Sequence, residues 1–246
     1  MEQARVSPTE VPDPEAGSNK KNFQFSEQSV RSRFVTKVFV LVTIMFSIVA
    51  IMCAIPFIIP TFKVWIQQNF IFMYIAMGIF VTVTIVLMCC SSVRRAYPTN
   101  LIVLAIFTLA AGYMTMAVTS AFNVQSVLLA LCMTTCSCAA IVIFAIYIKK
   151  DLTTLIGLVY VFGMTLVFFG LTASIACFAF NVTFLYTVYA ALGALLSMVY
   201  LAIDIQLIMG GRKFELSPEE YIFAAVQLFL DILNIFLFIL QIFGKS

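Results

Sequence analysis

The stretch SPEEYIFAAVQLFLDILNIFLFILQIFGKS, residues 217–246, decides the fold of this chain. Ser217 in the N-cap position, Pro218 at the first helical position and the acidic pair that follows are typical of a helix N-terminus. The apolar run 221–243 is long enough to cross a bilayer, which needs about 20 residues. The sequence therefore predicts a membrane-spanning helix over residues 219–243.

This helix carries one acid, Asp231, near the middle of its span. An ionised carboxylate there costs about 2.5–3.5 kcal/mol on insertion scales, so it must face protein or water. Steps of four, three, four and three place it on one helix face with Gln227, Asn234, Phe238 and Gln241. We therefore predict that this face points into the protein.

The composition extends this prediction to the whole chain. Of 246 residues, 63% are hydrophobic and only 10% are charged, which is typical of a polytopic membrane protein. We predict an all-α bundle of seven transmembrane helices. The six other apolar runs cover residues 34–60, 70–90, 101–120, 124–148, 155–180 and 184–209. An alternative with six full spans, in which the last segment is re-entrant, stays open.

The remaining segments are short and polar. Residues 1–33 contain three prolines, mixed charges and few apolar residues, so we predict a disordered cytosolic tail with no fold of its own. The sequence Asn181-Val182-Thr183 fits a glycosylation sequon but lies so close to the membrane that we interpret it as a turn. A net charge of +3 is too small to indicate binding to nucleic acid.

The cationic residues predict the orientation. Twelve of the fourteen Lys and Arg residues fall in the N-terminal segment through Lys37 and in the turns after the second, fourth and sixth runs, against only Lys63 and Lys245 on the other side. By the positive-inside rule, the N-terminus is cytosolic. With six spans only Lys245 would change sides, so the count does not distinguish the two topologies. We expect an internal membrane, the endoplasmic reticulum or Golgi, with the plasma membrane and endolysosomes as alternatives.

A second acid, Asp204, lies within the sixth run. It ends a stripe of tyrosines and small residues at steps of three and four: Tyr186, Tyr189, Gly193, Ser197, Tyr200 and Asp204. At about 1.5 Å per residue, Asp204 lies about 10 Å before the turn at Gly210, and Asp231 lies about 16 Å after Glu220. In adjacent antiparallel helices the two carboxyl groups can therefore meet at similar depth.

Three functions are open to such a pair. Ionising both of two neighbouring carboxyl groups is energetically unfavourable, so we predict that the pair shares a proton. Such a pair is a pH sensor. When deprotonated, it offers oxygen ligands for Ca²⁺. Alternatively, each acid only bonds to Tyr, Asn or Gln on a neighbouring helix and holds the bundle together. An intramembrane aspartyl protease is a third option, but such enzymes carry YD and GxGD motifs where this chain has AID at 202–204 and FLD at 229–231. We expect no enzyme.

Several motifs resemble those of one family. SPEEYIFAAVQLFLDILNIFLFILQIFG is similar to the C-terminal signature of the Lifeguard branch of the transmembrane Bax-inhibitor motif family. RRAYPTN at 94–100, FTLAAGYMT at 107–115, KKDLT at 149–153 and AIDIQL at 202–207 support the resemblance. It covers nearly everything after residue 34.

The resemblance implies a seven-helix bundle with a central last helix, Ca²⁺ leak from internal stores and suppression of cell death. It also implies a pH-sensitive latch between Asp204, Asp231 and an arginine at the end of the second helix. Arg94 is the match for that arginine, with Arg95 as the alternative. Gln227, Asn234, Tyr200 and Ser197 would form the supporting polar face. We expect no tightly bound cofactor and only transient Ca²⁺ on the two aspartates. The alternative is a non-conducting regulator that binds death receptors, Ca²⁺ channels or Bcl-type proteins.

Overall fold

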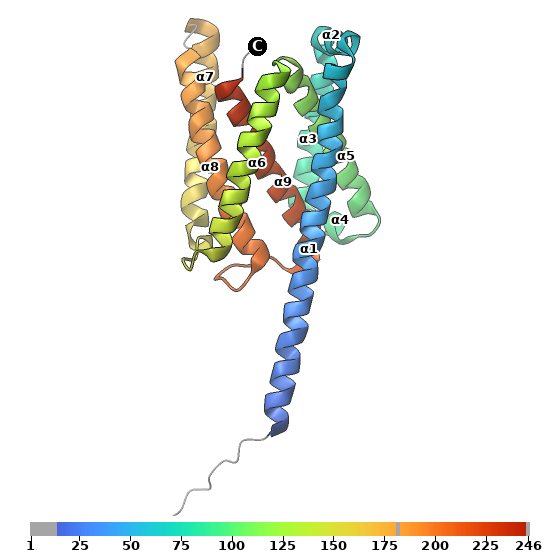
Figure 1. The fold of residues 1–246 in the computed structure, drawn as a ribbon, viewed down its shortest axis with the longest axis vertical. Coiled ribbons are helices and arrows are strands. Elements are labelled where there is room, and N and C mark those ends of the chain that lie inside the picture. The colour runs from blue at the N-terminus through green and yellow to red at the C-terminus, as the bar shows by residue number, and fades with distance from the viewer. Residues whose placement is uncertain (1–13, 181–182, 245–246) are drawn as a thin grey trace, which may run out of the picture.

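The computed structural model describes residues 14–180 and 183–244. Residues 1–13 of the predicted tail and Asn181 of the predicted turn lie outside the described residues. Within the described ranges the chain is a helical bundle (Figure 1). Its elements are α1 (Pro14–Ile58), α2 (Pro60–Gln68), α3 (Phe70–Cys89), α4 (Ser91–Arg95), α5 (Thr99–Ser120), α6 (Val124–Tyr147), η1 (Thr153–Leu155), α7 (Ile156–Phe180), α8 (Thr183–Met209), η2 (Pro218–Glu220) and α9 (Tyr221–Phe243).

Seven of these helices are long and apolar enough to cross a membrane: α1, α3, α5, α6, α7, α8 and α9. The predicted fold class is therefore confirmed. The last apolar run forms one continuous helix of 23 residues. At about 1.5 Å per residue this helix measures about 34 Å, which exceeds the hydrocarbon core of about 30 Å.

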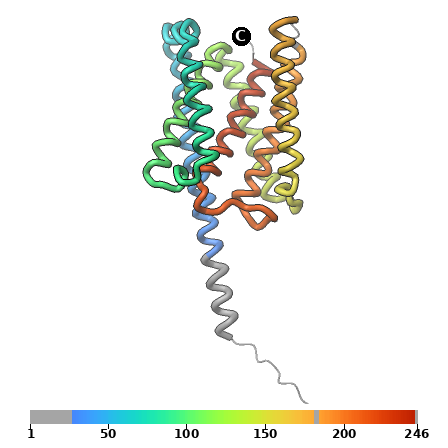
Figure 2. The backbone as a smooth tube through the Cα atoms, turned by 180° about the vertical axis from the view of Figure 1, so that it is seen from behind, coloured from blue at the N-terminus to red at the C-terminus, as the bar shows by residue number. Residues whose placement is uncertain are grey.

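Helix α9 lies in the middle of the bundle. It packs against α1, α5, α6 and α8, and Figure 2 shows it between the α3 and α5 side and the α7 and α8 side. The ring of Phe229 is fully buried, with its centroid 4.7 Å from that of Phe46 on α1 and 5.8 Å from that of Phe107 on α5. Buried Ala224 and Ala225 let neighbouring backbones approach closely, as membrane helix packing requires.

The predicted tail is wrong for residues 14–33, because α1 begins at Pro14 and continues into the first span. Arg31 explains part of this difference. Its guanidinium donates to the carbonyls of Leu216 (2.7 Å) and Leu207 (2.9 Å), which lie in the α8–α9 loop and near the C-terminus of α8. These two hydrogen bonds fix the polar residues around Arg31 against the bundle. The helix therefore continues from the apolar run into the polar sequence that precedes it.

Two segments predicted as loops contain short helices. Pro60 stands at the first position of α2, where its missing N–H costs nothing, and Ile59 before it is extended. Trp65 on α2 stacks on Phe62 with ring centroids 5.8 Å apart. Helix α4 follows a break at Cys90 and ends with Arg94 and Arg95. Both short helices lie at ends of the bundle (Figure 1).

Candidate functional site

A cavity of about 450 Å³ lies between α7, α8 and α9. Its walls combine the two polar stripes found in the sequence. From α8 come Tyr189, Gly193, Leu196, Ser197, Tyr200 and Asp204, and from α9 come Gln227, Leu230, Asp231, Asn234 and Phe238. Gly163, Leu166 and Val167 of α7 and Met88 of α3 complete it. The structure thus brings Asp204, Asp231 and the four residues of the predicted supporting polar face to one cavity.

The carboxyl groups of Asp204 and Asp231 lie within hydrogen-bonding reach of each other. Asp204 is only 5% exposed, and its Oδ2 accepts a hydrogen bond from Gln227 Nε2 at 3.3 Å. Oδ2 of Asp231 is buried without a donor among the described residues. The site therefore holds two carboxyl groups away from solvent, a position in which two negative charges are costly.

Tyr200 connects this cavity to α7. Its hydroxyl donates to the carbonyl of Val159 at 3.1 Å. The crossing depends on Gly163, because a Cβ there would lie 2.7 Å from Tyr200 Oη. At the far end of the two stripes, Gln241 Nε2 donates to the carbonyl of Tyr186 at 3.2 Å. Hydrogen bonds therefore join α8 and α9 both at the level of the aspartates and near Tyr186 and Gln241.

The structure does not place Arg94 or Arg95 on the aspartates. Arg94 Nε donates to Glu220 Oε2 at 2.8 Å, and its Nη1 donates to the carbonyls of Leu87 and Met88, both at 2.8 Å. Arg95 donates to Glu220 Oε1 at 2.7 Å. The predicted contact between arginine and aspartate is thus wrong for this structure. Glu220 lies about 16 Å from Asp231 along the helix. Glu220 binds both arginines at the end of the bundle. The charged groups lose less of their hydration there than they would beside the buried aspartates.

Glu220 could not be recognised as the partner of these arginines from its own surroundings in the sequence, because the acidic pair also fits a helix N-terminus. Two signals were present in the sequence. Two arginines at 94–95 and two acids at 219–220 were predicted on the same side of the membrane. Asn100 and Tyr221 were also missed: Asn100 Nδ2 donates to Tyr221 Oη at 2.8 Å, and Lys37 Nζ lies 4.2 Å from the centre of the Tyr221 ring. These contacts join α1, α5 and the start of α9.

Asp151 ties two loops together at the same end of the bundle. Its Oδ1 accepts from the hydroxyl of Thr153 at 2.6 Å and from the Thr153 N–H at 2.9 Å, while its Oδ2 accepts from the Lys213 N–H at 2.9 Å. The α6–α7 loop is thereby fastened to the α8–α9 loop, on the chain segment that precedes the central helix. These bonds hold the pKa of Asp151 below its usual value, with the Thr153 hydroxyl as the largest cause.

We expect Asp151→Asn to lower stability at neutral pH and to have less effect in acid. A depressed folded-state pKa means that ionised Asp151 stabilises the fold at pH values above its unfolded pKa, about 3.9, and that this contribution is lost as pH falls through the folded pKa. Thermal melting of both proteins in detergent between pH 7 and pH 3 measures this. The gap in melting temperature should narrow as the pH falls below about 4, and a gap that stays constant down to about pH 3 would contradict the assignment.

Comparison with known proteins identifies the family of this chain. The family model described as "Inhibitor of apoptosis-promoting Bax1" matches residues 31–246. Human Protein lifeguard 3 is 35% identical over 222 residues, which cover 90% of this chain and 71% of that protein. Bax inhibitor 1 of Schizosaccharomyces pombe is 28% identical over 238 residues, covering 97% of this chain and 86% of that protein. The chain is therefore a multi-pass integral membrane protein that belongs to the Bax-inhibitor family, in its Lifeguard branch.

Proposed function

We propose that this protein is a Ca²⁺ leak pathway gated by protonation of Asp204 and Asp231. The observation that supports it is the pair of adjacent carboxyl groups in a cavity within the membrane-spanning region. When both are ionised, they offer hard oxygen ligands of the kind Ca²⁺ prefers. When they share a proton, the hydrogen bond between them holds α8 to α9 and withdraws those ligands.

The shape of the cavity supports a pathway along α8. Its lining runs from Tyr189 to Asp204, which corresponds to about 22 Å of helix. The hydrocarbon core is about 30 Å thick, so the cavity follows most of the distance an ion must cover. Hydroxyl and amide groups of Ser197, Tyr200 and Asn234 line this length and provide polar contacts for a partly dehydrated ion.

In the cell we propose an internal membrane, of the endoplasmic reticulum or Golgi, with the N-terminus in the cytosol. The distribution of Lys and Arg supports this orientation. The leak would lower the Ca²⁺ content of the store and thereby blunt death signalling, in line with the description of the matching family as an inhibitor of apoptosis. Ca²⁺ is then cargo rather than a resident cofactor.

Flux through purified protein tests the proposal. Wild type, Asp204→Asn and Asp231→Asn are reconstituted in liposomes loaded with a Ca²⁺ indicator and compared from pH 6 to pH 8. We expect wild-type flux to rise with pH, by at most about tenfold per unit for one shared proton, and both variants to lose this dependence. Asp151→Asn, which removes a carboxylate outside the cavity, is the control. If wild type conducts no more than empty vesicles while correctly folded, the leak proposal is wrong.

The alternative is a non-conducting regulator that binds death receptors, Ca²⁺ channels or Bcl-type proteins. One observation supports it: α1 extends well beyond the bundle and offers a helix outside the membrane (Figure 1). A regulator of this kind should protect cells from death equally well with Asp204→Asn or Asp231→Asn. A leak pathway should not, so cell survival with these variants separates the two functions.

A further inference from the structure

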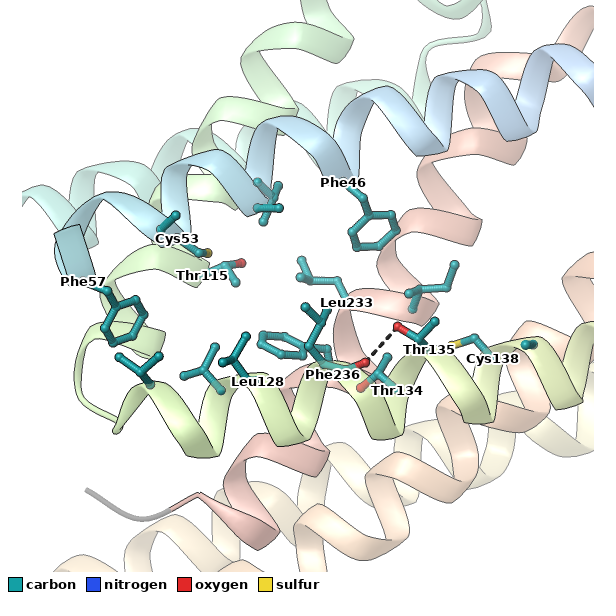
Figure 3. A pocket seen from close by; sticks show the side chains of 18 of the residues that line it. Phe46, Cys53, Phe57, Thr115, Leu128, Thr134, Thr135, Cys138, Leu233 and Phe236 are labelled. Atoms are coloured by element: carbon teal, nitrogen blue, oxygen red, sulfur yellow. Dashed lines mark hydrogen bonds between the residues drawn. The ribbon is translucent and has the colours of Figure 1, made fainter.

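A second and larger cavity lies on the other side of α9. It measures about 680 Å³ and is lined by α1 from Phe46 to Ile58, by α6 from Val124 to Val142, by three residues of α9 and by Thr115 of α5. Helix α1 packs on α5 and α9, and α6 packs on α8 and α9, so the two helices diverge. Figure 3 shows Phe46, Leu128 and Phe236 directed into the space between them. The cavity is therefore a gap between helices that opens toward the surrounding lipid.

The lining offers nothing to a polar ligand. It contains no charged residue, and its polar side chains are threonines and cysteines. The hydroxyls of Thr115, Thr134 and Thr135 each donate to a carbonyl one turn earlier in their own helix, at 2.8 Å. Since apolar cavities stay dry, the occupant must itself be apolar. The volume of the cavity lies within the range of about 300–1,000 Å³ that is typical of ligand sites.

The length of the cavity matches one leaflet of a bilayer. From Phe46 to Ile58 the wall formed by α1 measures about 18 Å. Half of a hydrocarbon core of about 30 Å is about 15 Å, the depth that an acyl chain fills. A transmembrane helix about 10 Å across would need about 1,400 Å³ over the same length. A single acyl chain therefore fits the space, and a partner helix does not.

A cation marks the mouth of the cavity. Phe57 belongs to the lining, and the ammonium of Lys63 on α2 lies 5.5 Å from the centre of its ring. No carboxylate in the described part of the chain forms an ion pair with Lys63. Trp65, exposed on the same short helix, is the residue type that sits at headgroup level. A positive charge thus lies beside the lining, on the same short helix as a tryptophan of the kind found at headgroup level.

We propose that this cavity binds one phospholipid, with an acyl chain between α1 and α6 and the phosphate against Lys63. The bound chain contacts Leu233 and Phe236, which lie two and five residues after Asp231 and therefore on the opposite face of α9. It therefore supports the central helix from the side away from the aspartates. The proposal does not depend on Ca²⁺ conduction and holds for a non-conducting protein as well.

Filling the cavity tests the proposal. Ala54 on α1 and Ala139 on α6 line it and are exposed, so Ala54→Phe and Ala139→Phe each place a ring in the space from opposite walls. Ala140→Phe is the control, since Ala140 is exposed on the same helix but outside the lining. Each protein is purified in detergent with equimolar phosphatidylglycerol and phosphatidylcholine, and retained lipid is measured by native mass spectrometry. Melting temperatures establish that the variants are folded.

We expect wild type and Ala140→Phe to retain one phospholipid, and both filling variants to retain at least tenfold less. Wild type should prefer phosphatidylglycerol, and Lys63→Gln should reduce that preference about fivefold, the factor for one lysine worth about 1 kcal/mol near a membrane surface. Equal retention by wild type and a folded filling variant would overturn the proposal. So would a wild type that retains no phospholipid, or one that retains an added sterol in its place.

Discussion

Replacing Glu220 with Gln is expected to lower the free energy of unfolding by about 3 kcal/mol. The side chains of Arg94 and Glu220 are only 13% and 12% exposed, and the carboxylate accepts from both arginines. Removing one partner of a buried ion pair leaves the other charge uncompensated, which costs about 3–5 kcal/mol. The loss also frees α4 from the start of α9. Unfolding of purified protein in mixed micelles with increasing dodecyl sulfate measures the difference.

Glu219→Gln is the matched control for this prediction. Glu219 pairs with Arg95 at 3.1 Å, but the two side chains are 68% and 50% exposed. An exposed pair contributes less than about 1 kcal/mol because water solvates both charges when they separate. If Glu219→Gln destabilised the protein as much as Glu220→Gln, simple loss of negative charge at the end of the bundle would explain both results.

Replacing Gln206 with Leu is expected to lower the free energy of unfolding by at least about 2 kcal/mol. Gln206 is 2% exposed, and its amide joins α8 to the end of α6 and the following loop. Oε1 accepts from the Leu152 N–H at 2.8 Å, and Nε2 donates to the carbonyls of Lys150 at 3.1 Å and Ala145 at 3.3 Å. Leucine has a similar size but cannot form these bonds. Each buried backbone group left without a partner costs about 1–3 kcal/mol.

Two measurements check the Gln206 prediction. Unfolding in mixed micelles gives the loss of stability, and hydrogen exchange of the Leu152 amide reports the local effect, which should be a clear loss of protection. Gln241→Leu serves as the control, since Gln241 forms one exposed bond to the Tyr186 carbonyl and should change stability by less than about 1 kcal/mol. Unchanged protection of Leu152 would show that Gln206 does not hold this loop.

The helices that cross the membrane could be predicted because the bilayer fixes their length and hydrophobicity. Every predicted run corresponds to one of the seven long apolar helices. The extra helices could not be predicted in the same way. Helix α2 and the N-terminal part of α1 contain polar residues, and contacts such as Arg31 with Leu207 and Leu216 lie far apart in the sequence. Local composition carries no information about such contacts.

The candidate site divides in the same manner. Helical periodicity placed Gln227, Asp231 and Asn234 on one face, and the antiparallel turn placed Asp204 at similar depth, so the meeting of these polar faces of α8 and α9 followed from spacing. The partner of Arg94 did not follow from spacing. Glu220 and the aspartates were all available as acids, and choosing between them depends on where α4 packs, which spacing within a single helix does not specify.

The sequence by itself determined that this chain has seven apolar runs long enough to cross a membrane and that two acids share helix faces with other polar residues, because apolar length and the period of 3.6 residues are local properties. Only the tertiary structure decided which groups meet. It paired Arg94 and Arg95 with Glu220, placed Gln206 on the α6–α7 loop and left a gap between α1 and α6. These outcomes depend on the angles and distances at which helices pack, and such geometry arises from contacts between residues distant in the chain.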